Sequence, residues 1–277
     1  MTLSGKARLA GLMGWPVAHS RSPRLHNWWI AEHGLDAVYV PLAVKPEDLE
    51  GALRALPKLG FEGCNLTIPH KEGALAIVDE VDGIARRVGA VNTVVVLADG
   101  RLWGSNSDVF GFAQSLRGDA PAWRPDAGDA VVLGAGGAAR AVIVALQDLG
   151  ARILVLNRTR PRAEELAREF GCAAADWEDR TRALAGAGLV VNTTSQGMAG
   201  EPPLDLALDR LSPTAVVCDV VYVPLRTPLL EAAAARGNPT VDGLNMLLHQ
   251  ARPGFERWFG VRPEVTPALR AHVLASL

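Results

Sequence analysis

The chain has 277 residues, enough for one large or two ordinary domains, and its 49% hydrophobic content is typical of a well-buried α/β protein. Its net charge is −2 without a basic stripe or charge run, which argues against nucleic acid and anionic membranes as partners. Cys64, Cys172 and Cys218 are too few and too far apart for a disulfide framework or a zinc site, so we expect no metal.

The beginning of the sequence does not predict a signal peptide. The apolar run 9–13 follows Lys6 and Arg8, but it is too short and ends at Trp15 and Pro16. No stretch reaches the length of a transmembrane helix. We therefore expect a soluble cytoplasmic protein, with its cysteines reduced in the core.

Strands and helices are predicted to alternate along the first part of the chain. The expected strands cover residues 8–13, 37–44, 61–66 and 91–97, and the expected helices cover 22–34 and 46–59. Ser22, ahead of Pro23, is expected to cap the first of these helices. Because residues 98–101 form a turn, 91–97 and 102–104 are predicted to pair as a hairpin.

A second α/β unit is predicted after residue 108. A helix over 108–117 leads into a segment rich in Pro, Gly and Asp at 118–128. The elements expected after it are strands 130–133, 152–156, 189–192 and 215–219, helices 137–149, 161–170, 227–236 and 243–259, and a last short helix from 266. This alternation favours α/β layers with largely parallel sheets, and two domains fit it.

The segment from Asn65 to Lys71 is a candidate catalytic motif. In an extended backbone, Asn65 and Thr67 share one face, and Pro69 then forces a turn. Lys71 is one of only four lysines among 28 basic residues. Lys can lose its proton when desolvated, whereas Arg effectively cannot, so the choice of Lys favours catalysis. A solvated lysine at a helix start is the alternative that these residues leave open.

A second motif predicts a dinucleotide site. Residues 131–139 read as strand, glycine turn and helix, in the G-x-G-x-x-A form of the Rossmann fingerprint. Gly134 would permit the tight turn, Gly136 the approach of the pyrophosphate, and Ala139 close packing of helix on strand. The backbone around Ala135, Gly137 and Ala138 would then present N–H groups to the phosphates.

The residues after the next strand predict NADP as the cofactor. An NAD enzyme usually places Asp or Glu there to bind the ribose 2′-hydroxyl. This chain instead has Asn157, Arg158, Thr159, Arg160 and Arg162, which suit a 2′-phosphate. The alternative, a solvated cationic helix start, is disfavoured because cations oppose the dipole at a helix N-terminus.

Several segments together resemble the shikimate dehydrogenase family. They are residues 14–27, 65–71, 89–93, 104–111, 134–139, 157–162, 192–195, 219–222 and 242–250, in the order of that family. The match departs from the family at Asn245, where a second glycine after Gly243 is expected, and at His249, where a smaller residue is expected. Neither departure removes a residue that catalysis requires.

The resemblance implies roles for individual residues. Lys71 and Asp108 would form the catalytic pair, and Ser20 and Ser22 would hold the substrate carboxylate. The remaining substrate residues implied are Asn65, Thr67, Asn92, Asp108 and Gln250 on the ring hydroxyls, with Tyr222 near the carboxylate, and Lys71 would contact the substrate as well. The remaining cofactor residues implied are Thr193, Ser195, Val220, Gly243 and Met246, of which Gly243 and Met246 would border the nicotinamide.

The resemblance also implies the architecture and the reaction. A mixed-sheet substrate domain would comprise residues 1–107 and 243–277, and a Rossmann-type NADP-binding domain residues 108–242. The expected reaction is the reduction of 3-dehydroshikimate to shikimate with NADPH, as in aromatic amino-acid and chorismate biosynthesis. Quinate or aminoshikimate dehydrogenases on the same scaffold, and an NADP(H) sensor without turnover, remain alternatives. The sequence leaves the oligomeric state open, a homodimer included.

Overall fold

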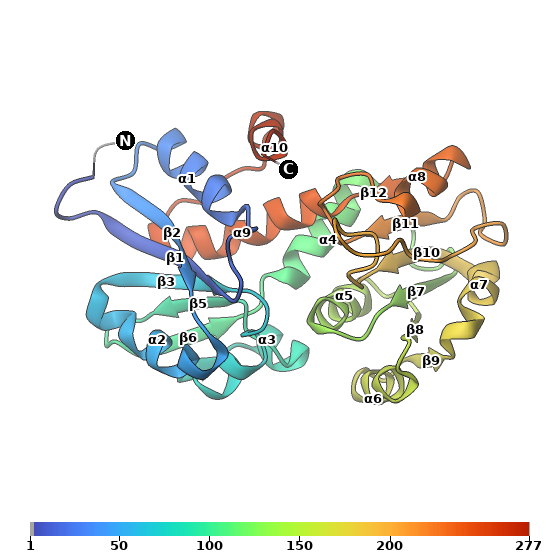
Figure 1. Cartoon of the computed structure of the whole chain (residues 1–277), viewed down its shortest axis with the longest axis horizontal. Helices are drawn as coiled ribbons and strands as arrows, with labels where there is room; N and C mark the ends of the chain where they lie inside the picture. Colours follow the sequence, from blue (N-terminus) through green and yellow to red (C-terminus); the bar gives the residue numbers. More distant parts are fainter. Residues whose placement is uncertain (1–2, 277) are drawn as a thin grey trace. The chain divides into compact units, whose positions relative to one another are not determined.

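Two sheets organise the chain into two units in the computed structural model, which describes residues 3–276 (Figure 1). Residues 1, 2 and 277, which we placed in the substrate domain, lie outside the described residues. The first unit comprises the chain up to Ser107 and from Gln250 to Ser276, and the second comprises Asp108–His249. The first unit therefore resumes at Gln250 and not at Gly243, as we expected. Asn245, which lies between these two positions, bonds Asp119 within the second unit.

The sheet of the first unit is mixed. Its strands are β1 (Arg8–Gly14), β2 (Ala37–Ala43), β3 (Phe61–Leu66), β4 (Glu80–Val81), β5 (Thr93–Val96) and β6 (Leu102–Ser105), in the order β2-β1-β3-β5-β6-β4. β1 runs parallel to β2 and β3, whereas β5 runs antiparallel to β3 and β6. The predicted hairpin is confirmed, because Thr93 pairs with Ser105 and Val96 with Leu102 across β5 and β6.

Two predicted helices of the first unit differ from the observed ones, one at a glycine and the other at prolines. α1 (Ser22–Glu32) ends before Gly34, which has a positive φ of 61°. The single helix expected over 46–59 is instead α2 (Leu49–Ala55) between 3₁₀ turns that begin at Pro46 and Pro57. Proline has no N–H to donate to an α-helical ladder, so Pro57 interrupts it. α3 (Gly83–Val88) and β4 were not predicted.

Different side chains cover the two faces of the first sheet. On one face, Leu49 and Leu53 of α2 pack in an apolar cluster with Cys64 and Leu66 of β3. The other face carries an aromatic cluster that includes Tyr39 of β2, Trp29 of α1, and Phe255 and Trp258 of α9 (Gly243–Phe259). α10 (Pro267–Leu274) then packs beside α1. Asn65 lies between Cys64 and Leu66 in β3, so its side chain points to the aromatic face.

The strand pairs of the second sheet are all parallel, where largely parallel sheets were predicted. Its strands are β7 (Asp129–Leu133), β8 (Ile153–Leu156), β9 (Ala173–Ala175), β10 (Ala187–Asn192), β11 (Val216–Asp219) and β12 (Thr240–Val241). Their order, β12-β11-β10-β7-β8-β9, is that of the Rossmann fold. The helices of this unit are α4 (Asp108–Asp119), α5 (Gly137–Asp148), α6 (Arg160–Phe170), α7 (Arg180–Ala183) and α8 (Pro228–Ala235), with the beginning of α9.

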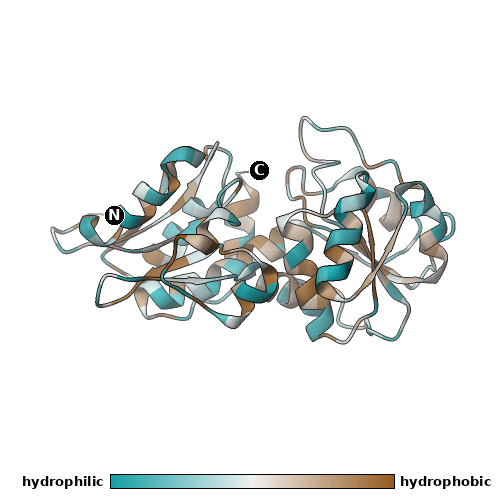
Figure 2. Ribbon diagram, turned by 90° about the horizontal axis from the view of Figure 1, so that it is seen from below, coloured by the Kyte–Doolittle hydropathy of each residue, from teal (hydrophilic) through white to brown (hydrophobic). Residues whose placement is uncertain are grey.

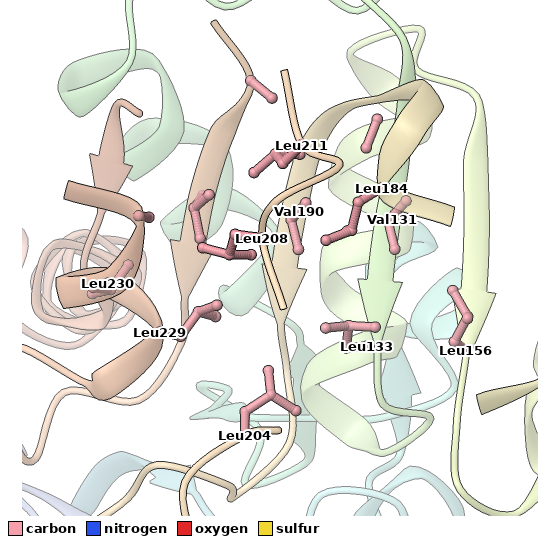
Figure 3. Close-up of a cluster of buried hydrophobic side chains, with 14 residues drawn as sticks. Val131, Leu133, Leu156, Leu184, Val190, Leu204, Leu208, Leu211, Leu229 and Leu230 are labelled. Atoms are coloured by element: carbon pink, nitrogen blue, oxygen red, sulfur yellow. The ribbon is translucent and has the colours of Figure 1, made fainter. Parts of the chain in front are cut away.

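Burial on both faces explains the continuous apolar runs of the second sheet. On one face, Val131, Leu133 and Val190 of the sheet pack against Leu208 and Leu230, from the loop before β11 and from α8 (Figure 3). Figure 2 shows that the strands of this sheet are hydrophobic, while hydrophilic residues gather on the surrounding helices and loops. Within residues 3–276, no helix is long and apolar enough to cross a bilayer.

Candidate active site

Asn65 occupies the end of β3 and is almost fully buried, with 4% of its surface exposed. Its Nδ2 donates to the main-chain oxygen of Asn92 at 3.1 Å and to Oγ1 of Thr93 at 3.2 Å. Its Oδ1 accepts from the hydroxyl of Tyr39 at 2.8 Å. A buried amide with each of these bonds made has a defined orientation. Thr67 follows β3, and its Cγ2 would lie 2.4 Å from a Cβ at position 14, so residue 14 must be glycine.

A polar network connects Asn92 to Gln250. Oδ1 of Asn92 accepts from the main-chain N–H of Ser107 at 2.8 Å and from the hydroxyl of Thr93 at 2.8 Å. The hydroxyl of Ser107 lies 3.1 Å from the same oxygen and 3.4 Å from Oε1 of Gln250. The structure therefore brings together Asn65, Asn92 and Gln250, three of the predicted substrate residues.

Thr93 and Ser107 link these residues, although sequence reasoning assigned neither of them a role. Both are buried and lie in segments that resemble the family, beside the asparagine and aspartate that drew attention. Their position within those segments was the only signal.

Lys71 lies in the turn after β3, and its side chain is half-buried. Its main-chain oxygen accepts from the N–H of Val91 at 2.8 Å, which fixes the backbone at this point. The neighbouring His70 is buried, and its Nε2 lies 2.8 Å from the main-chain oxygen of Val44. That contact supports a scaffold role for His70. Asp108, the predicted partner of Lys71, is buried at the start of α4 in the second unit.

The serine pair lies at the beginning of α1, but Ser22 does not cap the helix. The N-cap is Arg21, whose side chain makes no capping hydrogen bond, so the predicted cap is wrong. Ser22 is already the first helical residue, and its main-chain N–H donates to Oγ of Ser20 at 3.2 Å. The Ser22 hydroxyl therefore has no part in capping. The N–H groups at the beginning of a helix suit an anion, and α1 offers such a helix start beside this hydroxyl.

The glycine turn of the second unit has the geometry that a dinucleotide needs. Gly134 has a φ of 114°, and a Cβ there would lie 2.6 Å from Oγ1 of Thr193, so only glycine fits. A Cβ on Gly136 or Gly137 would meet no atom within 4 Å. Gly136 is the N-cap of α5, and no side chain caps this helix. The first N–H groups of a helix have no acceptor within the helix, so this uncapped end of α5 and its glycines fit a pyrophosphate.

Thr193 and Asn192 sit where β7 and β10 end side by side. The main-chain N–H of Thr193 donates to the oxygen of Leu133 at 2.9 Å, and its hydroxyl to the same oxygen at 2.7 Å. The strand order reverses between β7 and β10, and this is where open α/β sheets bind their ligands. Ser195 is exposed and lies beyond Thr193 in the same loop.

Asp219 ends β11 as a buried carboxylate surrounded by donors. Oδ1 accepts from Nδ2 of Asn192 and from the N–H of Val221, both at 3.0 Å, and Oδ2 accepts from the hydroxyl of Thr227 at 2.7 Å. Burial raises the pKa of Asp219 to about 6, although these three hydrogen bonds act in the opposite direction. The carboxylate holds the segment that contains Val220 and Tyr222, and sequence reasoning assigned it no role.

The start of α9 lies against this segment. A Cβ on Gly243 would lie 2.3 Å from the main-chain oxygen of Val220, so the two predicted cofactor residues are in contact and position 243 requires glycine. Met246 lies in the first turn of α9 and is half-buried. Nδ2 of Asn245 is 2.8 Å from both carboxylate oxygens of Asp119, at the end of α4. The departure from glycine at position 245 thus adds a contact between α9 and α4.

The arginines after β8 are not equivalent. Arg160 pairs with Glu164 at 2.9 Å and with Asp176 at 2.6 Å. Arg158, Thr159 and Arg162 are exposed, and within residues 3–276 no ion pair engages Arg158 or Arg162. Nδ2 of Asn157 donates to the main-chain oxygen of Thr159 at 3.0 Å, which shapes the turn into α6. Two cations therefore stay available for an anion at this point.

The part of the chain that the structure describes contains no group of three or more His, Cys, Asp and Glu side chains that could hold a metal ion.

Three family models match the chain. They are the shikimate dehydrogenase substrate binding domain over residues 12–94, shikimate / quinate 5-dehydrogenase over 124–199, and the shikimate 5'-dehydrogenase C-terminal domain over 243–271. The chain is 57% identical to the shikimate dehydrogenase (NADP(+)) of Paramagnetospirillum magneticum over 276 aligned residues. The alignment covers 99% of this chain and 100% of that protein.

Two solved structures extend the comparison. The shikimate 5-dehydrogenase of Thermus thermophilus, in complex with NADP(H) and shikimate, is 39% identical with a TM-score of 0.86, over 98% of this chain and 100% of that one. The quinate dehydrogenase of Corynebacterium glutamicum, in complex with NAD, is 35% identical with a TM-score of 0.91, over 97% and 99%. These similarities cover both units of the fold.

Proposed function

This chain belongs to the shikimate dehydrogenase family, and we propose that it is an enzyme that reversibly reduces 3-dehydroshikimate to shikimate with NADPH. The observation that carries the proposal is the 57% identity to an NADP(+)-dependent shikimate dehydrogenase across almost the whole chain. Arg158 and Arg162 support the choice of NADP, since they lie without an acidic partner where an NAD enzyme usually has an acid.

In this proposal, the first unit binds the substrate and the second binds NADP. Ser20 and Ser22 hold the substrate carboxylate, and Asn65, Thr67, Asn92, Asp108 and Gln250 bind ring hydroxyls, with Tyr222 near the carboxylate. The N–H groups of the turn from Gly134 to Ala138 bind the pyrophosphate. Asn157, Arg158, Thr159 and Arg162 bind the adenosine ribose and its 2′-phosphate. Thr193, Ser195 and Val220 also bind the cofactor, and Gly243 and Met246 border the nicotinamide.

NADPH supplies the hydride when it is bound, and the protein supplies orientation and a path for the proton. The carbonyl oxygen of the substrate gains negative charge as it becomes a hydroxyl, so it needs a donor close by. Lys71 donates the proton or stabilises that charge while a relay donates it. Asp108 orients Lys71 and accepts a hydrogen bond from a substrate hydroxyl. We infer that the protein works as a small-molecule enzyme of the cytoplasm.

Quinate dehydrogenase is the second candidate function, because the quinate dehydrogenase of C. glutamicum has the same fold over 97% of this chain. Turnover of shikimate, quinate and aminoshikimate, each with NADP and with NAD, distinguishes the candidates. We expect the highest kcat/KM with shikimate and NADP. A higher kcat/KM with quinate would reject the proposal in favour of the second candidate. NADP binding without any turnover would indicate a sensor instead.

A further inference from the structure

The hydrogen-bonding direction of Asn65 is fixed by main-chain groups. The oxygen of Asn92 is a carbonyl that can only accept, so the atom of Asn65 that faces it at 3.1 Å must be Nδ2. The second Nδ2 hydrogen is directed to Oγ1 of Thr93, whose own hydrogen is donated to Oδ1 of Asn92. Both N–H bonds of Asn65 are therefore used within the protein.

Only an acceptor remains on Asn65 for a ligand. An amide oxygen has two acceptor positions, and the hydroxyl of Tyr39 occupies one of them at 2.8 Å. His26 lies beside the Asn65 side chain, but neither of its ring nitrogens has a hydrogen-bond partner among the described residues, so the second position stays open. The phenol can take the donor role at any working pH, since burial raises the pKa of Tyr39 well above its usual range. A ligand that meets Asn65 must accordingly bring a hydrogen of its own.

The hydroxyl of Tyr39 is itself held in place from two directions. The ring is 1% exposed and stacks on His26, with 4.0 Å between the centroids and 6° between the planes. β2 is an edge strand, so its outer main-chain groups have no strand partner there. Asn27 supplies one, because its Oδ1 accepts from the N–H of Tyr39 at 3.0 Å and its Nδ2 donates to the oxygen of Tyr39 at 2.8 Å.

We propose that Tyr39 is a positioning residue whose hydroxyl holds the amide oxygen of Asn65 in place, so that this oxygen recognises only a substituent that carries a hydrogen, a hydroxyl or an amine. The inference rests on the proposed function, since it takes Asn65 as a substrate residue. His26 and Asn27, which lie in the family-like segment 14–27 but had no functional role, act in this arrangement through Tyr39.

The inference also selects which part of the substrate Asn65 meets. The oxygen that is reduced is a ketone in 3-dehydroshikimate and has no hydrogen to donate. Asn65 must therefore face one of the hydroxyls that stay unchanged in the reaction. A ketone or a methyl ether at that hydroxyl would place two acceptors against each other in a buried site, which the site rejects.

A double-mutant cycle tests this assignment. Tyr39→Phe removes only the hydroxyl and keeps the stacked ring. We expect it to raise the KM and the calorimetric Kd for shikimate about 2- to 10-fold, the effect of one hydrogen bond, with kcat and the KM for NADP unchanged. In the Asn65→Ala background, Tyr39→Phe should have no further effect. The Tyr39→Phe effect should also vanish for one analogue of shikimate that lacks a single ring hydroxyl.

Trp258→Phe is the matched control. Trp258 belongs to the same aromatic cluster, and its Nε1 donates to the main-chain oxygen of Val94 at 2.9 Å, so this variant also loses one buried hydrogen bond. We expect a lower Tm with an unchanged KM for shikimate. An equal rise in KM in Trp258→Phe, or additive penalties in the cycle, would overturn the inference alone. An Asn65→Ala variant with the wild-type KM and Kd would overturn both the inference and the proposed substrate site.

Discussion

Arg160 and Asp176 form an ion pair, with 2.6 Å between Nη1 and Oδ1, and Glu164 lies on the other side of the same guanidinium at 2.9 Å. The sequence suggested that either Arg160 or Arg162 could join Arg158 at the 2′-phosphate. The two carboxylates instead pair with Arg160, so Arg158 and Arg162 are the arginines that we expect at the 2′-phosphate.

We predict that Arg158→Ala weakens NADP binding about 10- to 100-fold, because a charge-assisted hydrogen bond to the phosphate is lost. Binding of NAD, which lacks that phosphate, should change little. Arg160→Ala is the control and should leave the NADP Kd near that of the wild type. Titration of both cofactors against the three proteins measures this. A wild type that uses NAD as well as NADP would show that the cluster is only a solvated helix start.

The proposed catalytic pair predicts a loss of turnover with binding retained. Lys71→Ala should lower kcat by about 10²- to 10⁴-fold while the Kd for shikimate stays nearly constant, since a general acid acts in the transition state. Asp108→Asn should lose activity as well. If the two residues act as a unit, the double variant should be hardly worse than the worse single variant. Steady-state kinetics and Lys6→Ala as a surface control complete the measurement, and simple additivity would separate the two roles.

Ser22 allows a clean test of the carboxylate site, because it makes no capping bond in α1. We predict that Ser22→Ala raises the KM for shikimate more than it lowers kcat and leaves the Tm close to that of the wild type. Thr266 offers the opposite case, since its Oγ1 caps α10 by accepting from the N–H of Leu269 at 3.2 Å. Thr266→Ala should cost about 1 kcal/mol of stability with no change in KM. A lower Tm without a change in KM for Ser22→Ala would reduce Ser22 to a structural residue.

His26 predicts a pH dependence of stability. Burial lowers the pKa of His26 from 6.5 to about 3, so the folded protein holds the ring neutral. Between these two values the unfolded chain binds the proton and the folded chain does not, so the free energy of unfolding falls as the pH is lowered from 6.5 towards 3. The contribution of His26 is complete above pH 6.5.

The measurement compares the Tm of the wild type and of His26→Phe between pH 7 and pH 5. The loss of Tm on acidification should be smaller in the variant. Asp219, whose raised pKa acts with the opposite sign, is present in both proteins and cancels in the comparison. Equal losses of Tm would show that His26 does not set this part of the pH dependence.

The sequence alone determined those features that depend on neighbouring residues. The apolar runs of the second sheet, the glycine turn at Gly134 and the turn that joins β5 to β6 follow from rules that operate over a few residues. The family-like segments added the activity, because their residue types and order are specific. Local rules failed where two neighbouring residues could each begin a helix. Ser22 has the residue type of a helix cap, but Arg21 is the N-cap and Ser22 is the first residue of the helix.

Only the tertiary structure decided which polar groups face each other. Asp176 is distant from Arg160 in the sequence, yet its carboxylate determines which arginine is free for the cofactor. Tyr39, on the edge strand β2, reaches Asn65 of β3 across β1, because both side chains lie on the same face of the sheet. Such contacts depend on strand order and on the direction of each side chain. For residues that lie far apart in the chain, the pattern of the sequence specifies neither of these. The fold and the family were therefore visible in the sequence, whereas the direction of each hydrogen bond in the predicted site was not.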